Sequence, residues 1–135
     1  METIPDSHKI NGRDYLFKLY DSAGADRYKS ITENLIKISD AILLVFSVDD
    51  RKSFESIAVW IKIIKENANN REIILILIGN KIDSKYIEIT NEEIINFSIS
   101  KNLKYFETSA KTGFGIQELF NQLYEDIYIK FIKDK

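Results

Sequence analysis

Two uninterrupted apolar runs limit the folds open to this chain more than any other feature. They cover Ala41–Ser47, which Asp40 precedes, and Ile73–Ile78, which Glu72 precedes. A strand with one wet face alternates apolar and polar residues, so a continuous apolar run indicates a strand covered on both faces. Amphipathic helical patterns follow both runs. Strands that alternate with helices predict an α/β fold with a mostly parallel sheet and flanking helices.

Turn and capping signals predict the neighbouring elements. Asn11-Gly12 is typical of a two-residue hairpin turn, which would join a strand ending at Lys9-Ile10 to an antiparallel strand at 15–20. Asp49-Asp50 offers an N-cap to a helix that reaches about Asn67. The chain is therefore expected to begin with a hairpin and to continue with strand–helix units.

A capping box opens the next helix. Thr90 would cap it, and the side chain of Glu93 would bond back to the Thr90 N–H. Apolar spacing extends this helix to about Lys101. The same reasoning predicts a loop and short helix over 25–38, a strand at 104–107 and a helix at 116–127.

Composition narrows the class of protein. The 135 residues are 44% hydrophobic, which suits one domain, 1–135, with a single core. A net charge of −2 gives no basic excess for nucleic acid, so we expect no nucleic-acid partner. The lack of cysteine excludes disulfides, thiol catalysis and cysteine-linked lipid anchors. No signal peptide or long apolar span is evident, so we expect a cytoplasmic protein with its single histidine, His8, at the surface.

Polar loops at three predicted strand ends carry the candidate chemistry. The first is Asp21-x-x-Gly24, which follows the strand at 15–20. An acid at a strand end brings a carboxylate to the ligand-binding edge of a parallel sheet, and a glycine lets a backbone N–H approach an anion. An ordinary turn is the alternative interpretation.

The second loop is Asn80-Lys81-x-Asp83, after the run at 73–78. A fixed carboxylate such as Asp83 can accept two parallel N–H bonds from the edge of a guanine base. The lysine stem can lie along the base, and the asparagine can cross-link neighbouring loops. A polar surface loop with an ion pair is the alternative.

The third loop is Ser109-Ala110-Lys111, after the strand at 104–107. A small side chain at Ala110 lets its backbone N–H come close to a ligand carbonyl, and Ser109 can brace the turn. A capped turn before a helix is the alternative for this loop alone.

Together these motifs resemble the Ras superfamily of small GTPases, nearest its Rab-like branch. The resemblance extends over about residues 3–128. The stretches that carry it are 21–32, 40–48, Ser53-Phe54 with Trp60, 79–83 and 107–113. It implies a P-loop NTPase-like α/β fold, GTP or GDP and Mg²⁺ as cofactors, and a function as a nucleotide switch in vesicle traffic or signalling.

The resemblance also implies a role for each motif. Asp21 would lie behind a magnesium-bound water, and the Gly24 N–H would touch a terminal phosphate. Asp83 would recognise guanine with support from Asn80 and Lys81, while Ser109, Ala110 and Lys111 would complete the base site. Thr3 matches a family threonine that binds magnesium. The segment from Gly24 to about Lys37 would be a switch, ordered by a triphosphate.

The sequence departs from the family at the phosphate site. It contains no Gly-x-x-x-x-Gly-Lys-Ser/Thr phosphate loop, which in the family supplies backbone N–H groups, a lysine and a magnesium ligand. Ala25 occupies the place of the glutamine that orients the attacking water. We therefore expect no catalytic residue here, negligible hydrolysis, and guanine binding that is weak or absent.

The departure extends to the fold. The sequence corresponds to an incomplete small-GTPase fold that lacks the first strand, the phosphate loop and the first helix. In the family that strand is central, between the strand ending at Asp21 and the strand at Ala41–Ser47. Three outcomes stay open: the two strands pair directly, the chain is marginally stable, or the sequence is a partial gene product.

Two functions follow from this resemblance. The first is a guanine-nucleotide switch, complete or degenerate. The second is a pseudo-GTPase, which binds effector or regulator proteins without nucleotide through Ala25–Lys37 and the Trp60 region, with Tyr15 and Phe17 nearby. Core packing is the alternative role for these aromatic residues. An unrelated receiver-type regulator would need more acids at the first strand end than Asp21 provides.

Overall fold

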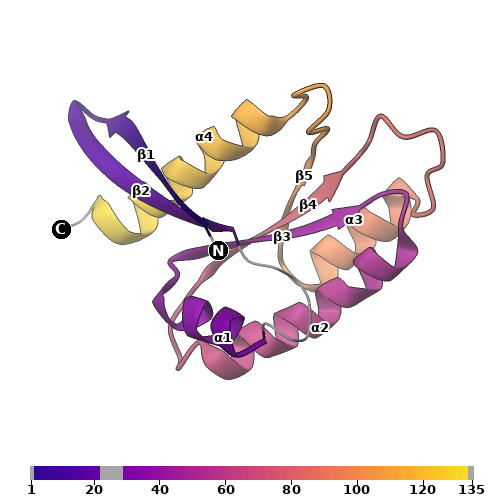
Figure 1. The fold of residues 1–135 in the computed structure, drawn as a ribbon, viewed down its shortest axis with the longest axis horizontal. Coiled ribbons are helices and arrows are strands. Elements are labelled where there is room, and N and C mark those ends of the chain that lie inside the picture. Colours follow the sequence, from indigo (N-terminus) through magenta and orange to yellow (C-terminus); the bar gives the residue numbers. More distant parts are fainter. Residues whose placement is uncertain (1, 22–28, 134–135) are drawn as a thin grey trace.

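A computed structural model describes residues 2–21 and 29–133 of the chain (Figure 1). Strands and helices alternate after an N-terminal hairpin, as the apolar runs predicted. The elements are β1 (Glu2–Ile10), β2 (Arg13–Asp21), α1 (Lys29–Ile38), β3 (Ala41–Ser47), α2 (Arg51–Asn67), β4 (Ile74–Asn80), α3 (Asn91–Ser100), β5 (Lys104–Glu107), α4 (Ile116–Ile127) and the π-helical turn η2 (Tyr128–Ile132).

The apolar runs form β3 and β4 of a parallel three-stranded sheet in the order β3-β4-β5, with β4 at its centre. The even-numbered side chains of β3 pack with α1, α2 and α3, in a core that includes Leu44 and Phe46. The other face of the sheet packs against α4 through Ile76 and Ile78 of β4. Figure 1 shows α4 on one side of the strands and the other helices opposite it. The expected α/β class, with helices on both faces of a parallel sheet, is confirmed.

The N-terminal hairpin forms a separate two-stranded sheet. Asn11 and Gly12 have φ values of 51° and 80°, which are the positive values that a type I′ turn requires. β1 pairs with β2 along its whole length, from Ile10 opposite Arg13 to Glu2 opposite Asp21. The strand before the turn ends at Ile10, as predicted, and it extends back to Glu2.

Aromatic contacts attach this hairpin to α4. The ring of Phe17 lies 4.3 Å from the ring of Tyr124, and the ring of His8 lies 4.5 Å from the same ring, measured between centroids. His8 is half-buried, so the expectation of a surface position was wrong. Tertiary packing of the hairpin on α4 places this histidine among aromatic residues.

The two sheets are not hydrogen-bonded to each other in residues 2–21 and 29–133. Of the three outcomes considered for the missing strand, direct pairing of β2 with β3 is therefore not formed. β3 is an edge strand, and its Val45 side chain is 54% exposed. Helices cover both faces of β3, as expected, through Leu43 on one face and Leu44 on the other, and Val45 is the exposed exception.

The helix boundaries agree with the capping signals. The Asp50 carboxylate accepts hydrogen bonds from the backbone N–H groups of Lys52 and Ser53, and α2 ends at Asn67 as expected. Asn69 and Asn70 then turn the chain with φ values of 53° and 60°. In the described part of the chain, no helix has the length and apolar character needed to cross a membrane.

Candidate functional site

The second and third predicted loops lie side by side at the carboxyl edge of the parallel sheet. Gly79 of β4 pairs with Glu107 of β5, so the residues that follow them leave the sheet together. Two backbone hydrogen bonds continue this pairing into the loops, from the Thr108 N–H to the Gly79 carbonyl (2.9 Å) and from the Ile82 N–H to the Thr108 carbonyl (3.3 Å). The register of two strands therefore brings together residues almost 30 positions apart in sequence.

Asn80 cross-links the two loops. Its Oδ1 atom accepts hydrogen bonds from the Thr108 hydroxyl and from the Ala110 N–H, both at 3.1 Å. Lys81 follows with a φ of 63°, a left-handed conformation that turns its exposed side chain out of the strand direction. The Asn80 bonds fix the position of Ala110, the residue predicted to contact a base carbonyl.

The Ala110 N–H has a partner within the protein, which the sequence did not indicate. It donates to Asn80, so a ligand carbonyl would share or replace this bond. Ala110 is exposed, and its methyl group leaves this approach open.

Ser109 holds Asp83 in place. The Ser109 hydroxyl donates to Oδ1 of Asp83 at 2.7 Å and accepts the Thr112 N–H at 3.2 Å. Ser109 is 1% exposed, so its hydroxyl is held in place by the packing around it. Asp83 is exposed, so its carboxylate stays accessible from solvent while Ser109 holds Oδ1.

The surroundings of Asp83 stabilise its charged form. The hydrogen bond from Ser109 is the largest cause of its lowered pKa, while partial burial acts in the opposite direction. The Asp83 backbone N–H and then the charges of Lys111 and Lys81 add to the lowering of the pKa. The edge thus presents an ionised, oriented carboxylate between two exposed lysines, which can accept a pair of N–H donors from a planar ligand.

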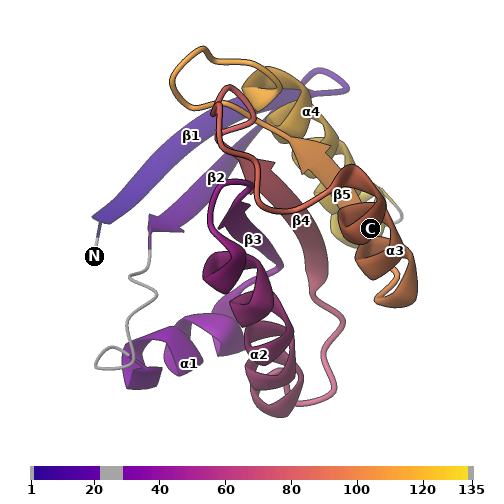
Figure 2. The same cartoon turned by 90° about the vertical axis from the view of Figure 1, so that its right-hand side faces the viewer.

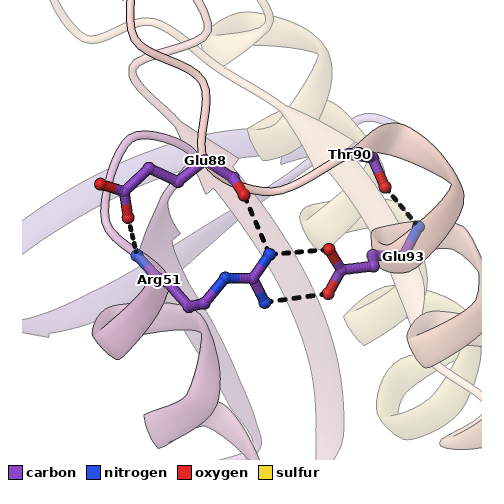
Figure 3. Close-up of polar contacts among 4 residues, drawn as sticks. All are labelled: Arg51, Glu88, Thr90 and Glu93. Carbon is purple, nitrogen blue, oxygen red and sulfur yellow. Dashed lines mark hydrogen bonds and ion pairs between the residues drawn. The ribbon is translucent and has the colours of Figure 1, made fainter.

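An arginine that sequence reasoning missed braces the loop that follows Asp83. The Arg51 guanidinium, at the start of α2, donates to both carboxylate oxygens of Glu93 at 3.0 and 2.8 Å and to the Glu88 carbonyl at 2.9 Å (Figure 3). The Arg51 N–H also donates to the Glu88 carboxylate at 2.9 Å. No local pattern links these residues, which lie 37 and 42 positions apart. The network ties the end of the base-site loop to α2 and α3.

This network changes the expected capping box. Thr90 accepts the Glu93 N–H at 3.2 Å, as predicted, while the main partner of the Glu93 carboxylate is Arg51 rather than the Thr90 N–H. Arg51 is the main cause of the lowered pKa of Glu93, and the Thr90 N–H makes the smallest contribution. A charged partner from another helix therefore outweighs the local bond of the capping box.

The predicted phosphate and metal residues are not part of the described geometry. Residues 22–28, which include Gly24 and Ala25, lie outside the described residues. Asp21 ends β2 and Thr3 lies in β1 opposite Tyr20, but their side chains also lie outside the described part. Among the side chains that the structure describes, no group of three acidic or histidine residues could hold a metal ion.

The aromatic residues expected at a partner surface are mostly packed. Trp60 is half-buried and packs against the core beneath α2. Phe17 lies against Tyr124, and Tyr15 lies edge-on to Tyr128 with 6.3 Å between ring centroids. Core packing, the alternative role considered for these residues, accounts for much of their surface.

The parallel sheet, its flanking helices and the two linked loops define an α/β domain of the small-GTPase class. The Ras family model matches residues 1–129, and the chain belongs to the Ras family. Its curated relatives include Rab proteins, the Rab-like branch that the motifs indicated.

Three relatives give the scale of the likeness. Ras-related protein Rab-13 of Mesocricetus auratus is 36% identical over 90% of this chain and 60% of its own length. Ras-related protein Rab-11B of Dictyostelium discoideum is 34% identical over 94% of this chain and 58% of its own length. Ras-related protein Rab-30 of Homo sapiens is 32% identical over 85% of this chain and 57% of its own length. The chain thus spans about 60% of the length of these relatives.

Proposed function

We propose that this chain is a Rab-like guanine-nucleotide-binding domain that recognises the base and binds nucleotide weakly. The observation that carries the proposal is the Asp83–Ser109 hydrogen bond at 2.7 Å, within two loops that Asn80 joins. It presents an oriented carboxylate at the edge where ligands of parallel α/β sheets bind.

The base would be recognised at three points. The Asp83 carboxylate would accept the ring N–H and the amino N–H of guanine, because each of its oxygens has lone pairs beyond the one that Ser109 uses. The Ala110 N–H would meet the base carbonyl, and the stem of Lys81 would lie along the base. Asn80 and Lys111 would support the loop geometry and the local charge.

We propose that the chain binds the phosphate groups of the nucleotide weakly. The sequence contains no phosphate-loop motif, and phosphate contacts supply much of the binding energy in sites of this kind. GTP or GDP with Mg²⁺ are the cofactors that the family implies, with Asp21, Gly24 and Thr3 as the matching residues. Ala25 has no hydrogen-bonding side chain to orient water, so hydrolysis would be negligible. Switching in vesicle traffic would require tighter nucleotide binding than we propose for this chain.

Binding of fluorescent GDP to the purified chain tests the proposal. The titration is run with and without Mg²⁺ and is competed with guanosine, GDP and ATP. We expect weak binding with little dependence on Mg²⁺, competed about equally by guanosine and GDP and not by ATP. Submicromolar binding that requires Mg²⁺ would contradict the weak phosphate site.

A charge-matched variant makes the base assignment specific. Asp83→Asn replaces an acceptor with an amide donor, so it no longer matches the amino group of guanine but matches the carbonyl that xanthine carries there. We expect the variant to lose guanosine and to gain xanthosine. Asp49→Asn, in an acid of the loop before α2, is the control and should leave guanosine binding unchanged.

The alternative is a pseudo-GTPase that binds effector or regulator proteins through Ala25–Lys37 and the Trp60 region. Partner capture that is the same with GDP, with a GTP analogue and without nucleotide would support this function. Capture that requires one nucleotide would support the switch.

A further inference from the structure

The turn at the tip of the hairpin carries a reactive pair of residues. Of the ten asparagines in the sequence, only Asn11 is followed by a glycine. Asparagine is among the thermolabile residues, because the next backbone nitrogen can attack its side-chain amide carbon and close a cyclic imide. Glycine hinders this attack least, since it has no Cβ atom beside the nitrogen. By local sequence, Asn11 is therefore the most reactive asparagine of the chain.

Solvent reaches this turn. Asn11 and Gly12 are both exposed, and a Cβ atom added to Gly12 would meet no atom within 4 Å. Ile10 and Arg13 flank the turn and pair across it, so the ladder hydrogen bonds beside the turn belong to them and not to the Gly12 nitrogen. Water and hydroxide therefore have access to the two atoms between which a bond would form, Cγ of Asn11 and N of Gly12.

The folded turn keeps these two atoms apart. Asn11 has a φ of 51°, in the left-handed region, where ψ is also positive. At such a ψ the following nitrogen lies on the side of the Cα–C bond opposite to Cβ, so the Asn11 side chain does not reach the Gly12 nitrogen. The bond between them can form only after the turn opens locally.

A contact with the C-terminal segment holds the turn in its folded form. The Asn11 Nδ2 atom donates to the Tyr128 hydroxyl at 2.6 Å, across 117 positions of sequence. The Tyr128 ring is half-buried and lies edge-on to Tyr15 of β2, with 6.3 Å between ring centroids. Figure 2 shows the hairpin alongside α4, which leads into Tyr128. Because this hydrogen bond engages the Asn11 amide, opening of the turn also has to break it.

We propose that Asn11 is a deamidation site, and that its hydrogen bond to Tyr128 sets the rate of the reaction. Once the turn opens, the Gly12 nitrogen bonds to Cγ of Asn11 and the Cγ–Nδ2 bond breaks. The amide proton of Gly12 passes through water to the departing nitrogen, which leaves as ammonia, and a succinimide remains. Water then opens either carbonyl of this ring, which gives an aspartate or an isoaspartate at position 11.

The isoaspartate product does not fit this turn. It adds a carbon atom to the main chain, and a two-residue turn has no room for it between the paired Ile10 and Arg13. A carboxylate also replaces the Nδ2 donor of the bond to Tyr128. The reaction therefore loosens the hairpin tip from η2. It uses none of the base-site residues, so this proposal holds or fails separately from the nucleotide proposal.

The test follows position 11 as the purified chain ages at neutral and at mildly alkaline pH. Peptide mapping by mass spectrometry detects the exchange of the amide NH₂ for OH, and methylation by an isoaspartyl methyltransferase distinguishes isoaspartate from aspartate. We expect both products at position 11, formed faster at the higher pH because the Gly12 nitrogen must lose its proton.

Asn102 is the internal control for this reaction. It is also exposed and has a positive φ of 55°, but Leu103 follows it, and the branched side chain of leucine hinders attack by its nitrogen. Asn102 should therefore stay unconverted while position 11 reacts. No conversion at position 11, aspartate as the only product, or equal conversion of Asn102 would overturn the proposal.

Two tyrosine variants test the role of the hydrogen bond. Tyr128→Phe removes the acceptor for Asn11 and keeps the ring against Tyr15, so conversion at position 11 should become about threefold or more faster. Tyr86→Phe is the matched control, because Tyr86 is 80% exposed in the loop before α3, and it should leave the rate unchanged. Equal rates for Tyr128→Phe and the parent chain would overturn the role of the bond.

Unfolding separates the effect of the structure from the local chemistry. In guanidinium chloride the turn and the Tyr128 bond are both lost, so the parent chain and Tyr128→Phe should react at the same rate, faster than the folded parent. Equal rates for the folded and unfolded parent would overturn protection by the fold. After conversion, the amides of Ile10 and Arg13 should exchange faster in the folded chain while those of α2 stay unchanged. Unaltered exchange at the tip would overturn the loosening of the hairpin.

Discussion

Two edges of the β-structure in this molecule differ in whether another segment is hydrogen-bonded alongside them. At the carboxyl ends of β4 and β5, strand pairing continues into the loops, and the side chains of Thr108 and Ser109 are 2% and 1% exposed. Along the facing edges of β2 and β3, no backbone hydrogen bond joins the two sheets within the described residues, and Leu16 is 63% exposed. We call these regions the closed edge and the open edge.

The difference shows that strand pairing is needed before short side chains can link neighbouring loops. At the closed edge, pairing of Gly79 with Glu107 brings the two loops so close that the short side chains of Asn80 and Ser109 form hydrogen bonds between them. At the open edge, no side chain is long enough to replace a strand. The closed edge should therefore be rigid and costly to alter, and the open edge tolerant.

The largest expected contrast is between two leucines. Leu77 is 0% exposed in the middle of β4, so Leu77→Ala should destabilise the chain by about 2–5 kcal/mol. Leu16 lies on the open edge, and Leu16→Ala should change stability by no more than about 0.5 kcal/mol. Urea unfolding measures both. A large loss from Leu16→Ala would mean that the open edge carries folding energy and would break the comparison.

A tight contact beneath the closed edge gives the second prediction. A Cβ atom at Gly79 would meet the Tyr105 hydroxyl and would lie 3.1 Å from the Phe46 ring, so Gly79→Ala should cost about 1–3 kcal/mol. The Tyr105 hydroxyl is buried without a hydrogen-bond partner, and burial raises the pKa of Tyr105 to about 12. Tyr105→Phe alone should thus be neutral or stabilising, by up to about 1 kcal/mol.

The double variant sharpens this result. Removing the hydroxyl relieves the closest contact of the new Cβ, so Tyr105→Phe should recover part of the Gly79→Ala loss in a double-mutant cycle of unfolding free energies. Strict additivity of the two changes would show that the contact is not the cause.

The Asp83–Ser109 bond gives the closed edge a pH dependence. The pKa of Asp83 is lowered from its ordinary 3.8, chiefly by the Ser109 hydroxyl. A lowered folded-state pKa contributes stability that is complete above the unfolded value and is lost as the pH falls through the folded value. Ser109→Ala should move the Asp83 pKa back up, as measured by NMR titration, and should lower the urea midpoint near pH 6.

The same variant predicts where the difference disappears. Below the lowered pKa of Asp83 both proteins carry a protonated carboxyl, so this contribution to the difference in midpoint should vanish. Ser100→Ala is the control, because its hydroxyl bonds only to the Phe97 carbonyl at a helix end. A pH-independent difference for Ser109→Ala would assign the loss to packing instead.

The smallest effect is expected from the hydrogen bonds of Arg51 to Glu93 and Glu88. Arg51→Met removes the donor to Glu93 and Glu88, so the lowered pKa of Glu93 should rise towards its ordinary 4.5. Both partners of this pair are more than 40% exposed, so the change in overall stability should be slight. The amides of the loop at 84–90 should exchange faster. Lys104→Met, which removes the ion pair with Asp126 at a different place, should leave that loop unchanged.

Local sequence signals placed most elements of the fold. Continuous apolar runs located β3 and β4, Asn11-Gly12 located the hairpin turn, and the hydrogen bonds of Asp50 and Thr90 occur where the capping patterns indicated. The Asn80 to Asp83 and Ser109 to Lys111 motifs were found for the same reason, since the chemistry of a strand-end loop depends on a few adjacent residues. Their roles in nucleotide binding stay predictions.

Contacts between distant segments could not be obtained in this way. The half-buried position of His8, the partner of Glu93 and the exposure of Val45 all depend on elements that lie far away in sequence. Neither hydrophobic periodicity nor a helix-capping pattern indicates which helix will pack against a given side chain.

The sequence by itself therefore determined the order of strands and helices, the ends of the helices and the polar loops of the base site. Each of these follows from interactions within a few residues, such as the N-cap bonds of Asp50. Only the tertiary structure decided that the β-structure separates into two sheets and that the Ala110 N–H is held by Asn80. Strand edges have no local signature, because the hydrogen bonds that satisfy them come from whichever segment lies alongside.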